Sequence, residues 1–147
     1  MNLVVDTNIV FSTLLNPHSA IGEILMNIQD DFRFFAPELL KDELKKYSSK
    51  IQAYSKLGQE ELSIIETLFL SNINFVSEEL ISKQSWMLAV ELTKGIDEDD
   101  APFVALSIEL NAKLWTGDKA LSKGLANKVA NMIMTTSDLK QLLDNNA

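Results

Sequence analysis

The sequence predicts an α/β fold, a three-layer α/β/α sandwich with a mostly parallel sheet of about five strands. Two observations lead to this prediction. Short apolar runs alternate along the chain with longer stretches that carry helix signals, which is the pattern of parallel strands joined by crossover helices. These runs also lack a polar face, as strands buried on both faces do. The chain has 147 residues, about one domain's worth, so we expect a single domain over residues 1–147.

In the first half of the chain, apolar runs rich in β-branched or aromatic residues predict the strands. Asn16-Pro17 separates two helical stretches, and Pro37 suits the first turn of a helix. In chain order, these signals predict a strand at 3–5, helices at 8–15 and 19–29, a strand at 33–36, helices at 37–47 and 60–71, and a strand at 73–76.

In the second half, capping residues set most of the predicted boundaries. Ser77 begins a helical region that ends at the stop signal Lys94-Gly95. Asp99 or Asp100 caps the next helix, which has Pro102 in its first turn. The remaining predicted elements are the rest of that helix to about residue 111, a strand at 112–115, a helix at 119–126, a strand at 129–134 and a short C-terminal helix capped by Ser137.

The composition excludes several kinds of catalytic site. There is no cysteine, which excludes disulfides, thiol catalysis and cysteine-bound zinc. The chain has a single histidine, His18, so a histidine-based zinc site or a Ser-His-Asp triad would have to depend on that one residue. Lys and Arg total 13 against 21 Asp and Glu, a net charge of −8. Carboxylates are therefore the main catalytic resource, and the acidity argues against a broad basic surface for nucleic acid.

The sequence predicts a cytoplasmic protein. The segment before Asp6 lacks the basic residues of a signal peptide. No apolar run approaches the ~18 residues that a membrane span needs, so we expect no membrane contact.

Carboxylates from distant parts of the chain are predicted to meet at one edge of the sheet. Asp6 directly follows the first strand, and Asp118 follows the strand at 112–115. Parallel sheets bind ligands outside the carboxyl ends of their strands, which places both acids at the same edge. Asp100 begins a helix that starts at this edge, and Asp97 lies one turn before it.

Glu43 is predicted to join this group. At about 100° per residue, Glu43 falls on the apolar stripe that Leu39 and Leu40 begin and that continues to Leu44 and Tyr47. A carboxylate on such a stripe is costly unless it has a partner. This helix starts at the sheet edge that holds Asp6. We therefore expect Glu43 to lie with the other acids at that edge.

These acids predict a site for a divalent cation. Like charges this close repel one another and take up protons unless a cation holds them. Oxygen-only ligands suit one or two Mg²⁺ or Mn²⁺ ions, which promote in-line hydrolysis of phosphate esters. Each aspartate taken alone is explained by a helix cap or a solvated turn, whereas Glu43 is the hardest of the acids to explain in that way. The prediction rests on their convergence.

The order and spacing of these motifs resemble those of PIN-domain ribonucleases over nearly the whole chain. The matching pieces are Leu3-Val4-Val5-Asp6-Thr7-Asn8, the helical Glu43, Asp97-x-x-Asp100 with Phe103-Val104-Ala105-Leu106, and Leu114-Trp115-Thr116-Gly117-Asp118. The resemblance implies an endoribonuclease dependent on Mg²⁺ or Mn²⁺. Its catalytic acids would be Asp6, Glu43, Asp100 and Asp118, its metal ligands Asp6, Asp97, Asp100 and Asp118, and its supporting residues Thr7, Asn8 and Thr116.

The resemblance also implies partners. Many relatives are VapC-type toxins, which small antitoxins neutralise and which often dimerise, so an antitoxin and a second copy of the chain are candidate partners beside RNA. The lysines next to the acids either contact RNA phosphates or form solvated helix faces. They are Lys41, Lys45, Lys46 and Lys50 near Glu43, and Lys119 near Asp118.

Two other functions remain open at this point. One is a PIN-like module that binds RNA or a protein without catalysis. The other is a Mg²⁺-dependent phosphohydrolase. Haloacid-dehalogenase-like phosphatases need a second Asp two positions after the first, where this chain has Asn8. A receiver domain needs an Asp after the third strand, where the chain offers only Glu78 and Glu79.

Overall fold

A computed structural model describes residues 1–26 and 32–145. Its sheet has five strands in the order β3-β2-β1-β4-β5, and all neighbouring strands are parallel. The strands are β1 (Asn2–Val5), β2 (Arg33–Pro37), β3 (Ile73–Val76), β4 (Lys113–Trp115) and β5 (Ile133–Met134). The predicted α/β fold with a parallel sheet is therefore confirmed.

Helices connect all of these strands. In chain order they are α1 (Thr7–Leu15), α2 (Ala20–Met26), α3 (Leu39–Lys46), α4 (Ser48–Tyr54), α5 (Gln59–Ser71), the 3₁₀ turn η1 (Glu78–Leu80), α6 (Lys83–Thr93), the 3₁₀ turn η2 (Glu98–Asp100), α7 (Ala101–Leu110), α8 (Lys119–Ala126) and α9 (Thr136–Asn145).

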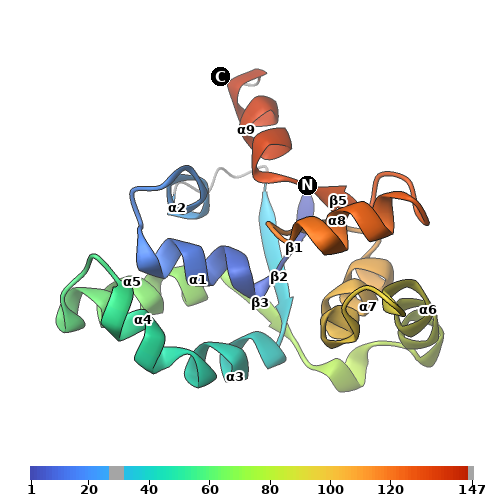
Figure 1. The fold of residues 1–147 in the computed structure, drawn as a ribbon, viewed down its shortest axis with the longest axis horizontal. Coiled ribbons are helices and arrows are strands. Elements are labelled where there is room, and N and C mark those ends of the chain that lie inside the picture. The colour runs from blue at the N-terminus through green and yellow to red at the C-terminus, as the bar shows by residue number, and fades with distance from the viewer. Residues whose placement is uncertain (27–31, 146–147) are drawn as a thin grey trace.

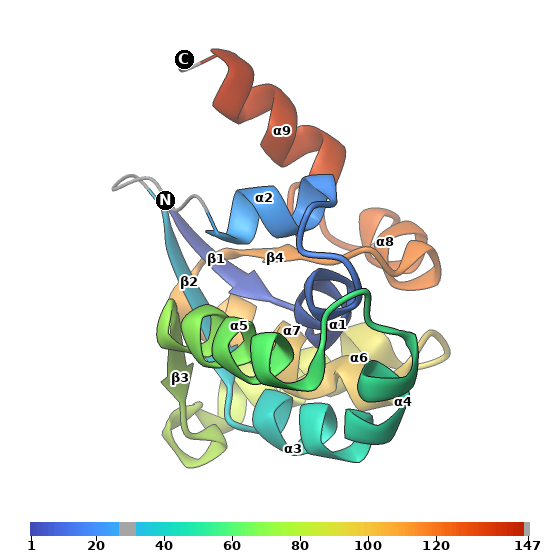
Figure 2. The same cartoon turned by 90° about the vertical axis from the view of Figure 1, so that its left-hand side faces the viewer.

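The helices form a layer on each face of the sheet. Figure 1 shows α1 to α5 on one side of the strands and α6, α7 and α8 on the other. Right-handed crossovers explain this division. The chain steps from β1 to β2 and β3 in one direction, then returns to β4 on the opposite side of β1. In Figure 2, α3, α4 and α5 face the viewer, and α9 extends away from the sheet beyond α2.

The core lies around the central strands. Leu3, Val4 and Val5 of β1 are fully buried, as a strand covered on both faces should be. The Trp115 ring of β4 is also fully buried, and its centroid is 5.8 Å from that of Phe34. Helix α7 contacts β1, β2 and β4, and its segment 103–107 is buried. This packing holds the start of α7 against the carboxyl ends of β1 and β4.

Two predicted helix starts are wrong. Pro37 is not in the first turn of α3 but ends β2, where it pairs with Val76. The ladder with β1 stops at Phe35, so the missing N–H of Pro37 leaves no bond to β1 unmade. The region from Ser77 is not one helix, because Ile81 returns to an extended backbone and Ser82 caps α6 separately.

Two predictions near the C-terminus are also wrong. The strand at 129–134 shortens to β5, because Asn131 adopts a positive φ of 63° that ends an extended run. Ser137 does not cap α9. Thr135 does, since the Asp138 backbone N–H donates to Thr135 Oγ1 (3.0 Å) and the Thr135 N–H donates to Asp138 Oδ2 (3.1 Å).

Other boundaries differ by a residue or two, and one helix was not predicted. Helix α4 is polar and buries only Ile51, so the sequence carries no apolar stripe that would reveal it. The predicted helix at 19–29 corresponds to α2, and its last residues lie outside the described residues. Within the described part of the chain, no helix combines the length and the hydrophobicity that crossing a membrane requires.

Candidate metal centre

The acidic residues meet at the carboxyl ends of β1 and β4, between which the strand order reverses. From β1 the chain turns to one face and from β4 to the other, so the carboxyl ends of these neighbouring strands border a crevice. A cleft of about 420 Å³ opens there. Its lining residues are Asp6, Thr7, Asn8, Leu39, Glu43, Lys46, Tyr47, Asp97, Asp99, Asp100 and Asp118. All five acids singled out in the sequence therefore line one cleft.

Asp6 is held at the floor of the cleft by Thr116. The Thr116 hydroxyl donates to Asp6 Oδ2 at 2.6 Å and accepts from the Asp118 backbone N–H at 3.1 Å. One hydroxyl thus positions the acids that follow β1 and β4. Asp6 precedes α1, but its side chain makes no capping bond to that helix. The hydrogen bond from Thr116 therefore contributes to the position of Asp6 beyond what its place before α1 provides.

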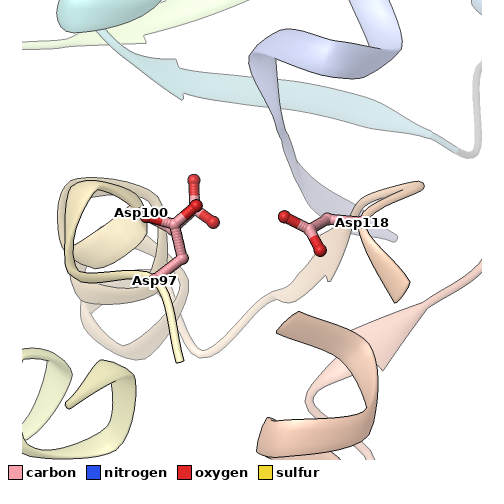
Figure 3. Close-up of side chains that lie close together, drawn as sticks. All are labelled: Asp97, Asp100 and Asp118. Atoms are coloured by element: carbon pink, nitrogen blue, oxygen red, sulfur yellow. The ribbon is translucent and has the colours of Figure 1, made fainter. Parts of the chain in front are cut away.

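Asp97, Asp100 and Asp118 form the tightest acidic group. Each offers a carboxylate oxygen within 4.8 Å of the other two. Figure 3 shows Asp97 and Asp100 beside the start of α7, with Asp118 facing them across the gap. Asp97 and Asp118 each use one oxygen as a cap, since Asp97 Oδ1 accepts from the Asp99 N–H and Asp118 Oδ1 from the Leu121 N–H. Each keeps a second oxygen for another partner.

Asp100 has an unpaired oxygen inside this group. Its Oδ2 is buried and lacks a hydrogen-bond partner among the described residues, as does Thr7 Oγ1. Asp100 occupies the N-cap position of α7, yet its side chain makes no capping bond. A buried carboxylate oxygen without a partner is costly. The orphaned oxygen and the all-oxygen donor set fit a divalent cation such as Mg²⁺ or Mn²⁺.

Burial and mutual repulsion raise the pKa of three acids. Burial is the main cause for Asp100, with the negative charges of Asp6, Asp97 and Asp118 adding to it, and its pKa rises to about 8. The pKa of Asp6 is raised chiefly by burial, against the hydrogen bond from Thr116. Burial and then the charge of Asp6 raise the pKa of Glu43. A bound cation would favour the charged forms of these acids.

Glu43, Thr7 and Asn8 lie on the helical side of the cleft. Glu43 is half-buried on α3 and lines the cleft outside the group of Asp97, Asp100 and Asp118, and Asp6 also lies outside that group. Thr7 is buried at the start of α1, whereas Asn8 is exposed. The cleft therefore has a tight aspartate side and a looser side that carries Glu43.

Of the five lysines considered for RNA contact, Lys46 lines the cleft and the other four do not. The Lys41 ammonium lies 4.3 Å from the centroid of the Phe75 ring. Lys45 and Lys119 are exposed outside the cleft lining.

Sequence reasoning missed the roles of Leu39, Tyr47 and Asp99 as lining residues. Leu39 and Tyr47 were assigned to an apolar stripe and Asp99 to a cap. The available signal was spacing, because Leu39 lies four residues before Glu43 and Tyr47 four residues after it, on the same face of a helix.

An α/β sheet with a carboxylate-rich cleft at its switch point defines a class of candidate metal-dependent proteins. The family model for the PIN domain matches residues 4–143 of this chain. The chain therefore belongs to the PIN domain family, which confirms the resemblance predicted from its motifs.

Two further comparisons agree with this assignment. The chain is 28% identical over 128 residues to the uncharacterized protein MJ1680 of Methanocaldococcus jannaschii, covering 82% of this chain and 73% of that protein. Its fold is similar to a chain in the crystal structure of VapBC2 from Rickettsia felis bound to a DNA fragment from their promoter. That match has a TM-score of 0.62 and 22% identity and covers 92% of this chain and 98% of the other. At this identity the match shows a shared fold.

Proposed function

We propose that this protein is an endoribonuclease that depends on Mg²⁺ or Mn²⁺ and hydrolyses RNA phosphodiester bonds at the acidic cleft. The observation that carries the proposal is the orphaned Asp100 oxygen, buried beside the carboxylates of Asp97 and Asp118 in a PIN domain. A fold that needed these acids only for capping would not leave that oxygen buried and unpaired.

Asp97, Asp100 and Asp118 would hold the cation, together with Asp6. When bound, a divalent ion neutralises charge on the reacting phosphate and activates a water molecule. Thr116 fixes the positions of Asp6 and Asp118 relative to each other, because its hydroxyl donates to the Asp6 carboxylate and accepts from the Asp118 backbone N–H. Thr7 and Asn8 border the same space, and hydrogen bonds from their backbone lower the pKa of Asp6 against the effect of burial, so we assign them to supporting this residue.

Glu43 lies across the cleft and has a different role in this proposal. Its pKa is raised by burial and by the charge of Asp6, whereas the Lys46 ammonium lowers it. A carboxylate whose pKa moves toward neutrality suits proton transfer. We assign Glu43 to orienting the attacking water and accepting its proton, and Lys46 to the approaching phosphate backbone.

The net charge of −8 makes RNA binding conditional on the cation. Without metal, the clustered carboxylates repel a phosphate backbone, and with metal the same cleft attracts it. Binding should therefore depend on Mg²⁺ or Mn²⁺ more than on a broad basic surface.

The test is cleavage of a labelled RNA by purified protein with Mn²⁺, with Mg²⁺ and with EDTA. The proposal expects products only with metal, and expects Asp6→Asn to abolish them. Asp42→Asn is the matched control, because Asp42 is exposed on α3 outside the cleft lining. Cleavage that survives in Asp6→Asn contradicts the metal mechanism.

The same experiment separates the two other candidate functions. Turnover of a generic phosphate monoester without RNA cleavage would indicate a phosphohydrolase. Metal-dependent RNA binding without any product would indicate a non-catalytic PIN module. Both results contradict the nuclease proposal.

A narrower proposal is that this nuclease is the toxin of a toxin-antitoxin pair. Its support is the fold shared with the VapBC2 structure. The test is whether a neighbouring gene encodes a small protein that binds this chain and inhibits cleavage. A homodimer is a further proposal, supported by the exposed side chains of Met87, Leu88 and Val90 on α6, and sedimentation equilibrium tests it.

A further inference from the structure

A second hollow opens next to the acidic cleft. It measures about 180 Å³ and is lined by Thr7, Asn8, Phe11, Tyr47 and Lys50. Thr7, Asn8 and Tyr47 also line the acidic cleft, so the two spaces adjoin at the start of α1. We call the smaller space the aromatic hollow. A group bound in it would lie directly beside a phosphate in the acidic cleft.

Two aromatic rings form the walls of the aromatic hollow. The rings of Phe11 and Tyr47 meet edge to face, with centroids 5.9 Å apart and planes at 70°. Phe11 is half-buried on α1 and packs against the core, whereas Tyr47 is 40% exposed. The Tyr47 backbone N–H donates to the Glu43 carbonyl at 3.1 Å. The hydrogen bond fixes the backbone of Tyr47 relative to α3, the helix that carries Glu43.

Lysines flank both rings. Lys50 Nζ lies 5.7 Å from the centroid of Phe11, and Lys46 Nζ lies 5.9 Å from the centroid of Tyr47. Lys46 also lines the acidic cleft, and Lys50 lines the aromatic hollow. These cations are placed to meet phosphates on either side of a group seated against the two rings. The exposed amide of Asn8 adds one hydrogen-bond donor group and one acceptor at the same place.

The size of the aromatic hollow limits its occupant. Pockets for drug-sized ligands hold ~300–1,000 Å³, and the aromatic hollow is smaller than that range. It accommodates one planar ring system, and the chain on either side of that ring must run along the surface. A nucleotide base in an RNA strand is a planar ring system with a phosphate on each side, which matches two rings flanked by Lys46 and Lys50.

We propose that the aromatic hollow holds one unpaired RNA base next to the phosphate that is cut, and that Phe11, Tyr47 and Lys50 form this base site. The inference rests on the proposed nuclease function. Stacking on aromatic side chains is how proteins hold bases that have left a helix. Bases inside a duplex are stacked and paired, so none can enter the aromatic hollow. Selection of the cleavage site then follows from which base fits beside Phe11, Tyr47 and Asn8.

The first test measures stacking directly. Short single-stranded RNAs carry 2-aminopurine at one position each and are mixed with the wild-type protein in Ca²⁺, with intact RNA verified on a gel. The proposal expects quenching of fluorescence at one position, because the base stacks on Tyr47. Tyr47→Ala should remove that quenching and raise the Kd by roughly 5- to 150-fold. Tyr47→Phe should keep the quenching and the wild-type Kd, since phenylalanine keeps the ring.

Tyr54→Ala is the matched control for this test. Tyr54 lies on α4, is 71% exposed and lines neither space. If Tyr47→Ala fails to fold, Tyr47→Leu replaces it, because leucine fills the space without a planar ring. Quenching that persists in the Ala or Leu variant, or an equal rise in Kd in Tyr54→Ala, overturns the proposal.

The second test measures cleavage of a single-stranded RNA and of the same sequence in a duplex, with Mn²⁺. Wild type should prefer the single strand, and Tyr47→Ala should lose this preference mainly through KM. An unchanged preference in Tyr47→Ala refutes the base site while the nuclease function stands. If neither RNA is cleaved, the nuclease function fails, and the quenching experiment still decides whether the aromatic hollow holds a base.

Discussion

Replacing Asp100 by asparagine should raise the stability of the metal-free protein against unfolding and lower that of the protein in the presence of metal. Asp100 lies half-buried between Asp97 and Asp118, and one of its oxygens has no hydrogen-bond partner among the described residues. Asparagine keeps the shape of the side chain and removes the charge. A structural role for Asp100 predicts the opposite sign in the metal-free protein, because a useful contact would be lost.

The magnitude follows from the raised pKa of Asp100. A rise from 3.8 to about 8 would correspond to roughly 6 kcal/mol for a fully buried group. Solvent reaches Asp100, so we reduce this to about 1–2 kcal/mol. The folded state binds the proton more tightly than the unfolded chain does. The stability of the metal-free wild type therefore falls as the pH rises from about 4 to about 8, and the advantage of Asp100→Asn grows over that window.

Bound metal should reverse the stability ranking of the wild type and Asp100→Asn. A ligand at 100 times its Kd stabilises the folded state by about 2.7 kcal/mol. Wild type should gain about this much with saturating Mn²⁺, whereas Asp100→Asn should gain little at the same concentration. The assay is urea unfolding at pH 5 and pH 9, with EDTA and with Mn²⁺, and with Asp42→Asn as the control for a lost surface charge. The reasoning is refuted if Asp100→Asn is less stable than wild type in EDTA at pH 9.

Two further predictions concern a positioning residue and a close contact in the fold. Thr116→Val removes the hydroxyl that bonds to Asp6 and Asp118, and it should weaken Mn²⁺ binding by about 10- to 100-fold, with recovery in Thr116→Ser. Calorimetric titration checks this, and wild-type affinity in the valine variant contradicts it. Gly22→Ala places a Cβ 2.3 Å from the Pro17 carbonyl oxygen, so the clash should outweigh the better helix propensity and cost about 1–3 kcal/mol. Thermal unfolding measures this against Gly58→Ala, whose added Cβ meets nothing within 4 Å, and equal melting temperatures would show that the chain relaxes around the clash.

The signals that predicted the fold correctly were local ones. The strand at 73–76 and the helix at 119–126 match β3 and α8, because apolar runs and capping residues act within a few positions. The errors came where a distant contact decided the outcome. Pro37 became part of β2 because β3 pairs with it. The strand at 129–134 shortened because Asn131 adopts a left-handed backbone that one sequence does not reveal.

The convergence of the acids could be predicted for a topological reason. Asp6 and Asp118 each follow a strand, and in a parallel sheet all strands end at the same edge. The same reasoning could not predict which lysines line the cleft. Lys41 turns toward Phe75 while Lys46 lines the cleft, and the difference depends on how α3 is rotated against its neighbours.

The sequence by itself determined the alternation of strands and helices, the supply of carboxylate oxygens without cysteine, and the edge of the sheet at which the acids gather. These follow from residue types and short-range periodicity. Only the tertiary structure decided that Thr116 positions Asp6 across 110 residues of chain, that one Asp100 oxygen is buried without a partner, and that Phe11 meets Tyr47 beside the cleft. The physical reason is that rotamers, burial and hydrogen-bond partners depend on packing between segments far apart in sequence, and local patterns do not encode that packing.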